Sequence, residues 1–191
     1  LVDRPGDARK IHTRTMPRFG GAAVFVSVLL VGLLYAMLGQ WDFDVVPVRF
    51  AVGILLASIV LIVGGSFDDK YDLPAKLTWL FPAAAAAIVI YFGVGVGITF
   101  LSNPFGGQIP LSHSILGIPL SIIFLWVWIM GMTYTTKLLD GLDGLASGVS
   151  LIGGLVMFAL SLTDKINQPV TATLAIIFVG ALAGYIVYAF N

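Results

Sequence analysis

The chain has 191 residues, of which 59% are hydrophobic and 10% are charged, and its mean hydropathy is +1.01. Soluble domains carry about 25% charged residues, so this composition excludes an ordinary soluble protein and predicts an integral membrane protein. The net charge is zero. Cysteine is absent, which excludes disulfides and thiolate chemistry within these residues.

Residues 1–19 are polar and basic, which excludes a secretory signal peptide. They contain Lys10 and His12 among several arginines and end in Pro-Arg-Phe. Clustered cations suit a phosphate-rich ligand. The structural alternative is that they are juxtamembrane cations in contact with anionic lipid headgroups.

Six apolar segments follow, each close to the 20 or so residues that a helix needs to cross a bilayer. None contains a charged residue, and each is too long and too uniformly apolar for the core of a soluble protein. We therefore predict an all-α integral membrane protein with a single polytopic domain over residues 1–191. The predicted spans are residues 20–39, 50–67, 77–94, 115–136, 144–163 and 169–190.

Six spans place the connecting loops on alternating sides of the membrane. Residues 1–19, 68–76 and 137–143 share one side and hold eight of the ten Lys and Arg residues. The positive-inside rule makes that side cytoplasmic. In the longest outer loop, the turn-rich segment Asn103–Gly107 lies between two β-prone runs, which predicts a short extracytoplasmic β-hairpin.

Five of the ten acidic residues fall in two short clusters at span ends on the predicted cytoplasmic side. The first contains Asp68, Asp69 and Asp72, which lie on neighbouring faces if the preceding helix continues for a turn. Like charges at that spacing repel unless a cation compensates them, and Mg²⁺ prefers carboxylates together with phosphate oxygens. The alternative is a solvated turn whose acids are neutralised by Lys70 and Lys76.

In the second cluster, Asp140 and Asp143 alternate with Gly141 and Gly144, which permit a tight backbone close to a ligand. The alternative is a helix end capped by glycine. Carboxylates for a cation and basic residues for phosphate on one membrane face favour phosphoryl transfer, in which positioning and charge neutralisation do most of the catalysis. A hydrophobic co-substrate would reach such a site from the lipid.

Together, three motifs resemble those of the polyprenyl-phosphate N-acetylhexosamine-1-phosphate transferases of glycosyltransferase family 4. They read DRPGDARKIHTRTMPRFGG, FDDKYDLPAK and LLDGLDGLASG. Their order and spacing agree with the WecA/TagO branch over essentially the whole chain. The related MraY branch has a different first loop.

This resemblance implies Mg²⁺-dependent transfer of a sugar 1-phosphate, with N-acetylglucosamine 1-phosphate the favoured group, from a UDP-sugar to polyprenyl (undecaprenyl) phosphate. UMP is released, and Mn²⁺ is an alternative cofactor. The resemblance also implies a multi-pass protein of the bacterial inner membrane that begins the assembly of a cell-envelope glycan such as teichoic acid or lipopolysaccharide. A homodimer is expected, and no nucleic-acid partner.

Site residues follow from the same resemblance. Asp68, Asp69 and Asp143 match catalytic positions, while Asp69 and Asp140 match metal ligands. The residues that match substrate contacts are Lys10, His12, Asp72, Lys76, Lys137, Asp140, Gly141 and Leu142.

The chain departs from the family pattern in two respects. Tyr134 and Lys137 stand where the family usually has Asn. The family also continues beyond the counterpart of Asn191 into a PAxxFMGDxGS loop, whose Asp is the principal magnesium ligand. We therefore expect the chain to be a fragment without the first span and the C-terminal spans, and to be inactive alone.

Other functions remain as alternatives. A UDP-MurNAc-pentapeptide phosphotransferase would share the second and third motifs. A transporter-like, nonenzymatic protein predicts charges near mid-membrane, whereas these acids lie at segment ends. A CDP-alcohol phosphatidyltransferase is excluded, because the required Ala-Arg pair does not follow Asp140-Gly141.

Overall fold

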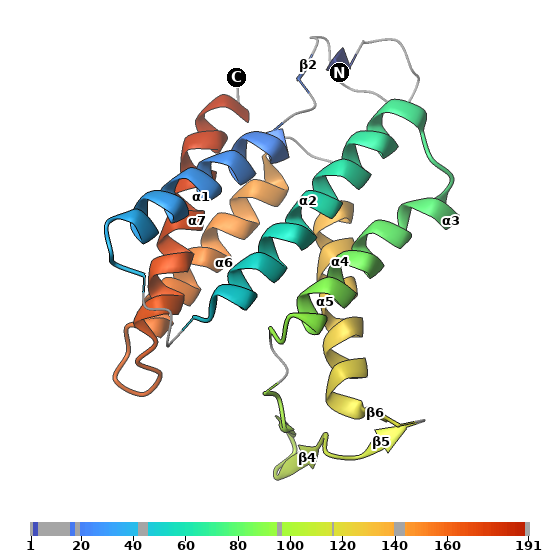
Figure 1. Cartoon of the computed structure of the whole chain (residues 1–191), viewed down its shortest axis with the longest axis vertical. Coiled ribbons are helices and arrows are strands. Elements are labelled where there is room, and N and C mark those ends of the chain that lie inside the picture. The colour runs from blue at the N-terminus through green and yellow to red at the C-terminus, as the bar shows by residue number, and fades with distance from the viewer. Residues whose placement is uncertain are drawn as a thin grey trace. The chain divides into compact units, whose positions relative to one another are not determined.

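The computed structural model in Figure 1 describes residues 2–3, 16–17, 20–41, 46–94, 97–115, 117–139 and 144–189. Most of these residues are helical. The helices are α1 (Gly20–Met37), α2 (Val48–Tyr71), α3 (Ala75–Thr78), α4 (Leu80–Tyr91), α5 (Leu120–Leu139), α6 (Leu145–Ser161) and α7 (Pro169–Ala189). The strands are β1 (Val2–Asp3), β2 (Met16–Pro17), β3 (Phe100–Ser102), β4 (Gln108–Pro110), β5 (Ser114–Ile115) and β6 (Ile118–Pro119).

Four of the described helices are long and apolar enough to cross a membrane: Gly20–Met37, Val48–Tyr71, Leu120–Leu139 and Pro169–Val187. Two further predicted spans, residues 77–94 and 144–163, form shorter apolar helices over Lys76–Tyr91 and Leu145–Ser161. The prediction of an all-α membrane protein is confirmed. The six-span arrangement stays a prediction.

Two segment starts differ from the predicted boundaries. The segment that begins near residue 77 is interrupted at Trp79, which separates α3 from α4. Pro82 lies in the first turn of α4, where a missing backbone N–H is tolerated. Helix α5 begins at Leu120 rather than near 115, because β5 and β6 form a tight antiparallel turn around Gly117, whose φ is +80°.

The chain divides into two compact units. The first comprises Leu1–Val46, Gly65–Asp72 and Leu139–Asn191. Within it, α7 packs against α1 and α6 at positions where one partner is glycine. Gly20 lies against the ring of Tyr185, and Gly154 lies against Val179. Without a hydrophobic driving force in lipid, helices associate by such close backbone approach.

The second unit comprises Pro47–Gly64 and Leu73–Leu138. Here the small residues Gly53, Ala57 and Gly64 form the buried face of α2. The side chain of Phe92 packs against Gly53, and the side chain of Phe81 of α4 packs against Gly64. Helix α5 is joined to α4 by a hydrogen bond that Trp126 Nε1–H donates to the carbonyl oxygen of Ala83 over 3.3 Å. These contacts hold α4 between its two neighbours.

We expect Gly64→Ala to destabilise the protein by about 1–3 kcal/mol, the usual cost of overpacking. An added Cβ would collide with Cβ and Cγ of Phe81, which are fixed close to the backbone of α4. Gly65→Ala is the matched control, because a Cβ there meets nothing within 4 Å. The unfolding midpoint in detergent micelles checks this. Equal midpoints for the two variants would contradict the packing of Phe81 on Gly64.

The predicted β-hairpin is present. Strands β3 and β4 pair antiparallel with Leu101 opposite Ile109. Asn103 Oδ1 accepts a hydrogen bond from the backbone N–H of Phe105 over 3.0 Å, and Gly106 and Gly107 follow with φ of +104° and +84°. Side-chain capping by Asn and glycines at positive φ are the turn chemistry that the sequence indicates.

Candidate functional site at the C-terminal end of α2

The first aspartate cluster lies on the last turn of α2. The helix continues past the predicted span end at residue 67 to Tyr71, so Asp68 and Asp69 are helical. The backbone N–H of Asp72 donates to the carbonyl oxygen of Asp68 over 2.9 Å, so the last helical hydrogen bond reaches this residue. That Asp72 shares a face with Asp68 and Asp69 stays a prediction. Asp72 itself has a φ of +49° and ends the helix. Asp tolerates this left-handed conformation better than most residues.

The position of these acids is electrostatically unfavourable for the isolated helix. The C-terminal end of a helix carries partial negative charge, and each acidic side chain there costs about 0.3–1 kcal/mol. Asp68 is half-buried, while Asp69 and Asp72 are exposed. A cation bound here would be attracted by the carboxylates and by the partial negative charge of the helix end.

Aromatic residues flank the carboxylates, and sequence reasoning missed them. The rings of Phe67 and Tyr71 stack with their centroids 5.8 Å apart, and Lys70 Nζ lies 5.0 Å from the centre of the Tyr71 ring. Both rings are about half exposed, at 48% and 57%. Their i,i+4 spacing is the signal that could have revealed the pair. This helix end therefore presents apolar as well as anionic surface.

Of the second aspartate cluster, residues 140–144, only Gly144 lies among the residues that the structure describes. Gly144 has a φ of +74° and caps α6, where its carbonyl oxygen accepts from the N–H of Gly148 over 2.8 Å. At this glycine the structure shows the helix end capped by glycine that the sequence left as the alternative, and the close approach to a ligand stays a prediction.

Gly144→Ala should destabilise the start of α6 by about 1–2 kcal/mol, because an L-residue pays that cost in the left-handed region. Gly148→Ala serves as the control, because Gly148 lies inside α6 and a Cβ added there meets nothing within 4 Å. There alanine is the better helix former. Chemical unfolding in micelles compares the two variants, and a Gly144→Ala midpoint at or above that of Gly148→Ala would refute the strain.

The two described cations of the predicted site lie in the second unit. Lys76 is exposed on the short helix α3, which follows Pro74. Lys137 is exposed on the last turn of α5, where a cation complements the helix dipole. Just before it, Thr133, Thr135 and Thr136 donate to carbonyl oxygens of their own helix. Nothing in the structure explains why Tyr134 and Lys137 replace the usual Asn.

Six of the predicted site residues lie outside the part of the chain that the structure describes. They are Lys10, His12, Asp140, Gly141, Leu142 and Asp143. The structure thus joins Asp68, Asp69 and Asp72 at one helix end, and it does not test the remainder of the site. Within the described ranges, no three His, Cys, Asp or Glu side chains are grouped to hold a metal ion.

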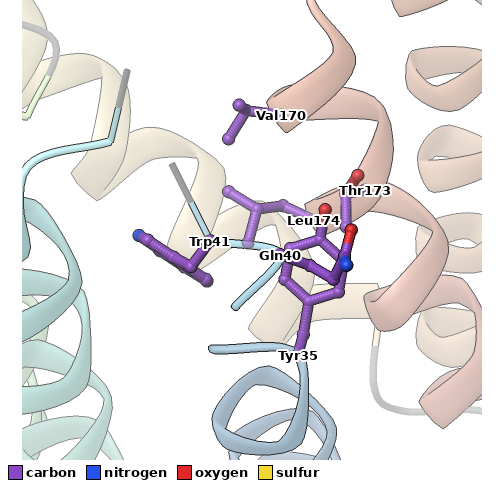
Figure 2. A pocket seen from close by; sticks show the side chains of 6 residues that line it. All are labelled: Tyr35, Gln40, Trp41, Val170, Thr173 and Leu174. Carbon is purple, nitrogen blue, oxygen red and sulfur yellow. The ribbon is translucent and has the colours of Figure 1, made fainter. Parts of the chain in front are cut away.

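A small pocket lies elsewhere in the first unit, between the end of α1 and the start of α7 (Figure 2). The ring of Tyr35 packs edge-on against Trp41, whose Nε1–H donates to the carbonyl oxygen of Val46 over 3.2 Å. No ionisable group other than the Tyr35 hydroxyl lines it, so the pocket lacks the charges that phosphoryl transfer needs. Its lining residues are Tyr35, Gln40, Trp41, Val170, Thr173 and Leu174.

The helices and the carboxylate-bearing helix end define a membrane-embedded, mostly helical protein with a candidate cation site at the end of a span-length helix. The chain belongs to glycosyl transferase family 4, whose sequence model matches residues 51–191. The resemblance in the three motifs is thereby confirmed at the level of the family. No solved structure gives a significant match to the chain.

Curated relatives match the chain over nearly its whole length. A probable undecaprenyl-phosphate N-acetylglucosaminyl 1-phosphate transferase of Bacillus subtilis is 30% identical over 190 residues, covering 100% of this chain and 48% of the relative. An undecaprenyl-phosphate α-N-acetylglucosaminyl 1-phosphate transferase of Thermotoga maritima is 30% identical over 166 residues, covering 87% and 45%. A phospho-N-acetylmuramoyl-pentapeptide-transferase of Staphylococcus aureus is 28% identical over 185 residues, covering 92% and 54%. The chain thus spans about half the length of these relatives.

Proposed function

We propose that the protein transfers N-acetylglucosamine 1-phosphate from a UDP-sugar to a polyprenyl phosphate. An oxygen of the lipid phosphate forms a bond to the β-phosphorus of the nucleotide sugar. The bond from that phosphorus to the bridging oxygen breaks, and UMP leaves with the bonding electrons. The products are UMP and a polyprenyl diphosphate sugar. Relatives named for this acceptor and sugar support the proposal.

The observation that carries the proposal is the Asp68–Asp69 pair on the last turn of the span-length helix α2. Phosphoryl transfer brings two negatively charged phosphate groups together. Catalysis therefore depends on positioning these groups and on neutralising their charge. A helix end fixes the two carboxylates more firmly than a loop does. The exposed rings of Phe67 and Tyr71 beside them suit a co-substrate that approaches from the lipid.

We assign Asp68 to orient and deprotonate the lipid phosphate, and Asp69 to hold Mg²⁺ together with Asp140. The donor set fits this ion, because Mg²⁺ accepts one or two carboxylates and completes its shell with water and substrate phosphates. When bound, Mg²⁺ neutralises charge on the phosphates. Asp143 completes the carboxylate set. Lys10, His12, Asp72, Lys76, Lys137, Gly141 and Leu142 are assigned to substrate contacts.

We also place the protein in the bacterial inner membrane, with residues 1–19, 68–76 and 137–143 on the cytoplasmic side. The uneven distribution of Lys and Arg supports this orientation. UDP-sugars are water-soluble, so their site belongs on the side where they are available. A single polytopic domain and a homodimer belong to the same proposal.

The test is UMP release by membranes that contain the full-length natural protein, supplied with polyprenyl phosphate and Mg²⁺. We expect release with UDP-N-acetylglucosamine and none without the lipid. The Staphylococcus aureus relative supports one alternative donor, UDP-MurNAc-pentapeptide. Release with that donor alone would favour the alternative, and no release with either donor would refute the phosphotransferase.

A further inference from the structure

The tip of the hairpin formed by β3 and β4 exposes a large aromatic side chain. Phe105 is 97% exposed, more than any other large apolar residue in the described ranges. Two hydrogen bonds fix the backbone of the turn. The N–H of Phe105 donates to Asn103 Oδ1, and the N–H of Asn103 donates to the carbonyl oxygen of Gly107 over 3.1 Å. The turn therefore presents the ring outward in one backbone conformation.

Other apolar side chains of the same segment are also uncovered. Phe100, Ile109 and Ile118 are 47%, 48% and 48% exposed. The segment follows α4 and leads straight into α5, since β6 ends at Pro119 and α5 begins at Leu120. Figure 1 shows β4, β5 and β6 beyond the N-terminal end of α5. The predicted span arrangement places these residues at the membrane surface, where α4 ends and α5 begins.

The charge pattern distinguishes this segment from the other connections. No Asp, Glu, Lys or Arg occurs between Lys76 and Lys137. By contrast, the short connection between α6 and α7 carries Asp164 and Lys165, both exposed. A charge-free segment can place its side chains in the apolar edge of the bilayer, because charged groups are costly to move into an apolar environment.

We propose that the hairpin tip inserts Phe105 into the interfacial region of the bilayer, so that the β3–β4 hairpin anchors this end of the second unit in lipid. The occupant of the exposed surface is therefore the membrane rather than a protein. The segment carries no Asp, Glu, Lys or Arg, and it is joined directly to the membrane-length helix α5.

Single-cysteine labelling tests the proposal, since these 191 residues contain no cysteine. In the full-length protein, with any other cysteine replaced by Ser, Phe105→Cys is labelled with the NBD fluorophore and reconstituted into phosphatidylcholine vesicles. Lys165→Cys is the matched control on a charged connection. We expect lipids that bear a nitroxide near the headgroup to quench the label at 105 at least threefold more than the label at 165. Aqueous iodide should show the reverse order.

Two results would overturn the proposal. Equal iodide quenching at both positions, without lipid quenching, would place the tip in water. Protection of position 105 from both quenchers would show that protein covers it.

A second series excludes an effect of the label itself. The label is moved to Ser102→Cys, beside the turn, and Phe105 is changed to Asp or to Leu. Lipid quenching should fall at least twofold with Phe105→Asp and stay unchanged with Phe105→Leu. Equal quenching in both backgrounds would refute insertion by the ring.

Discussion

Asp69→Asn is expected to slow UMP release by the full-length protein at least about 100-fold, the usual scale for losing a positioned charged group in catalysis. The change removes one negative charge and keeps the size of the side chain. Asp69 is exposed on the last turn of α2, so no buried packing is lost. Activity should therefore fall while the fold is kept.

Two measurements check this expectation: the rate of UMP release in membranes and the unfolding midpoint in micelles. Asp164→Asn is the control, because Asp164 is an exposed aspartate on the connection between α6 and α7. It should leave both quantities unchanged. If Asp69→Asn kept the full rate, the assignment of the candidate site to the end of α2 would be wrong. A falling midpoint would show instead that Asp69 is needed for the fold.

Removing divalent cations should abolish activity, and Mg²⁺ or Mn²⁺ should restore it. The reason lies in the carboxylates of α2, which repel one another and the phosphates of both substrates until a cation compensates them. Asp68→Asn lowers the negative charge beside the proposed ligand Asp69. The rate at saturating Mg²⁺ should fall about 100-fold, because the group assigned to deprotonate the lipid phosphate is lost. In the activity that remains, we expect the Mg²⁺ concentration for half-maximal activity to rise about tenfold, which corresponds to 1.4 kcal/mol of binding free energy.

Chelation with EDTA followed by a Mg²⁺ titration measures this requirement, and circular dichroism verifies that helix content is unchanged. Ca²⁺ provides the control cation, because it prefers more ligands at longer distances and should restore little activity. Full activity in EDTA would exclude a metal-dependent mechanism. An unchanged Mg²⁺ requirement in Asp68→Asn would show that Asp68 does not contribute to binding the cation.

Much of the fold follows from simple features of the sequence. Long uncharged segments predict helices, and the segment around Asn103 and Gly107 predicts the β-hairpin. The ends of helices were less predictable. Residues 115–119 are as apolar as the span that follows them, so hydropathy does not distinguish them from α5. The positive φ at Gly117 makes them a turn instead.

For the site, the sequence predicted which acids belong together but not how the backbone presents them. Charge alone favours ending α2 before Asp68, because acids oppose the dipole at a helix C-terminus. The helix nevertheless continues to Tyr71, and Asp72 ends it in a left-handed conformation. Aspartate is one of several residues that adopt this conformation, so composition does not foretell where it occurs. Asp140 and Asp143 lie outside the described residues, and their assignment stays a prediction.

The length of α2 has a consequence for the membranes in which the protein works. Its 24 residues extend about 36 Å, against roughly 30 Å of hydrocarbon in a typical bilayer. Asp68 and Asp69 lie on the last turn of this helix, so a change in its tilt moves them relative to the bilayer. Thicker or thinner bilayers change that tilt through hydrophobic mismatch. The acyl-chain length of the surrounding lipids should therefore influence the position of the carboxylates relative to the phosphate of a lipid substrate.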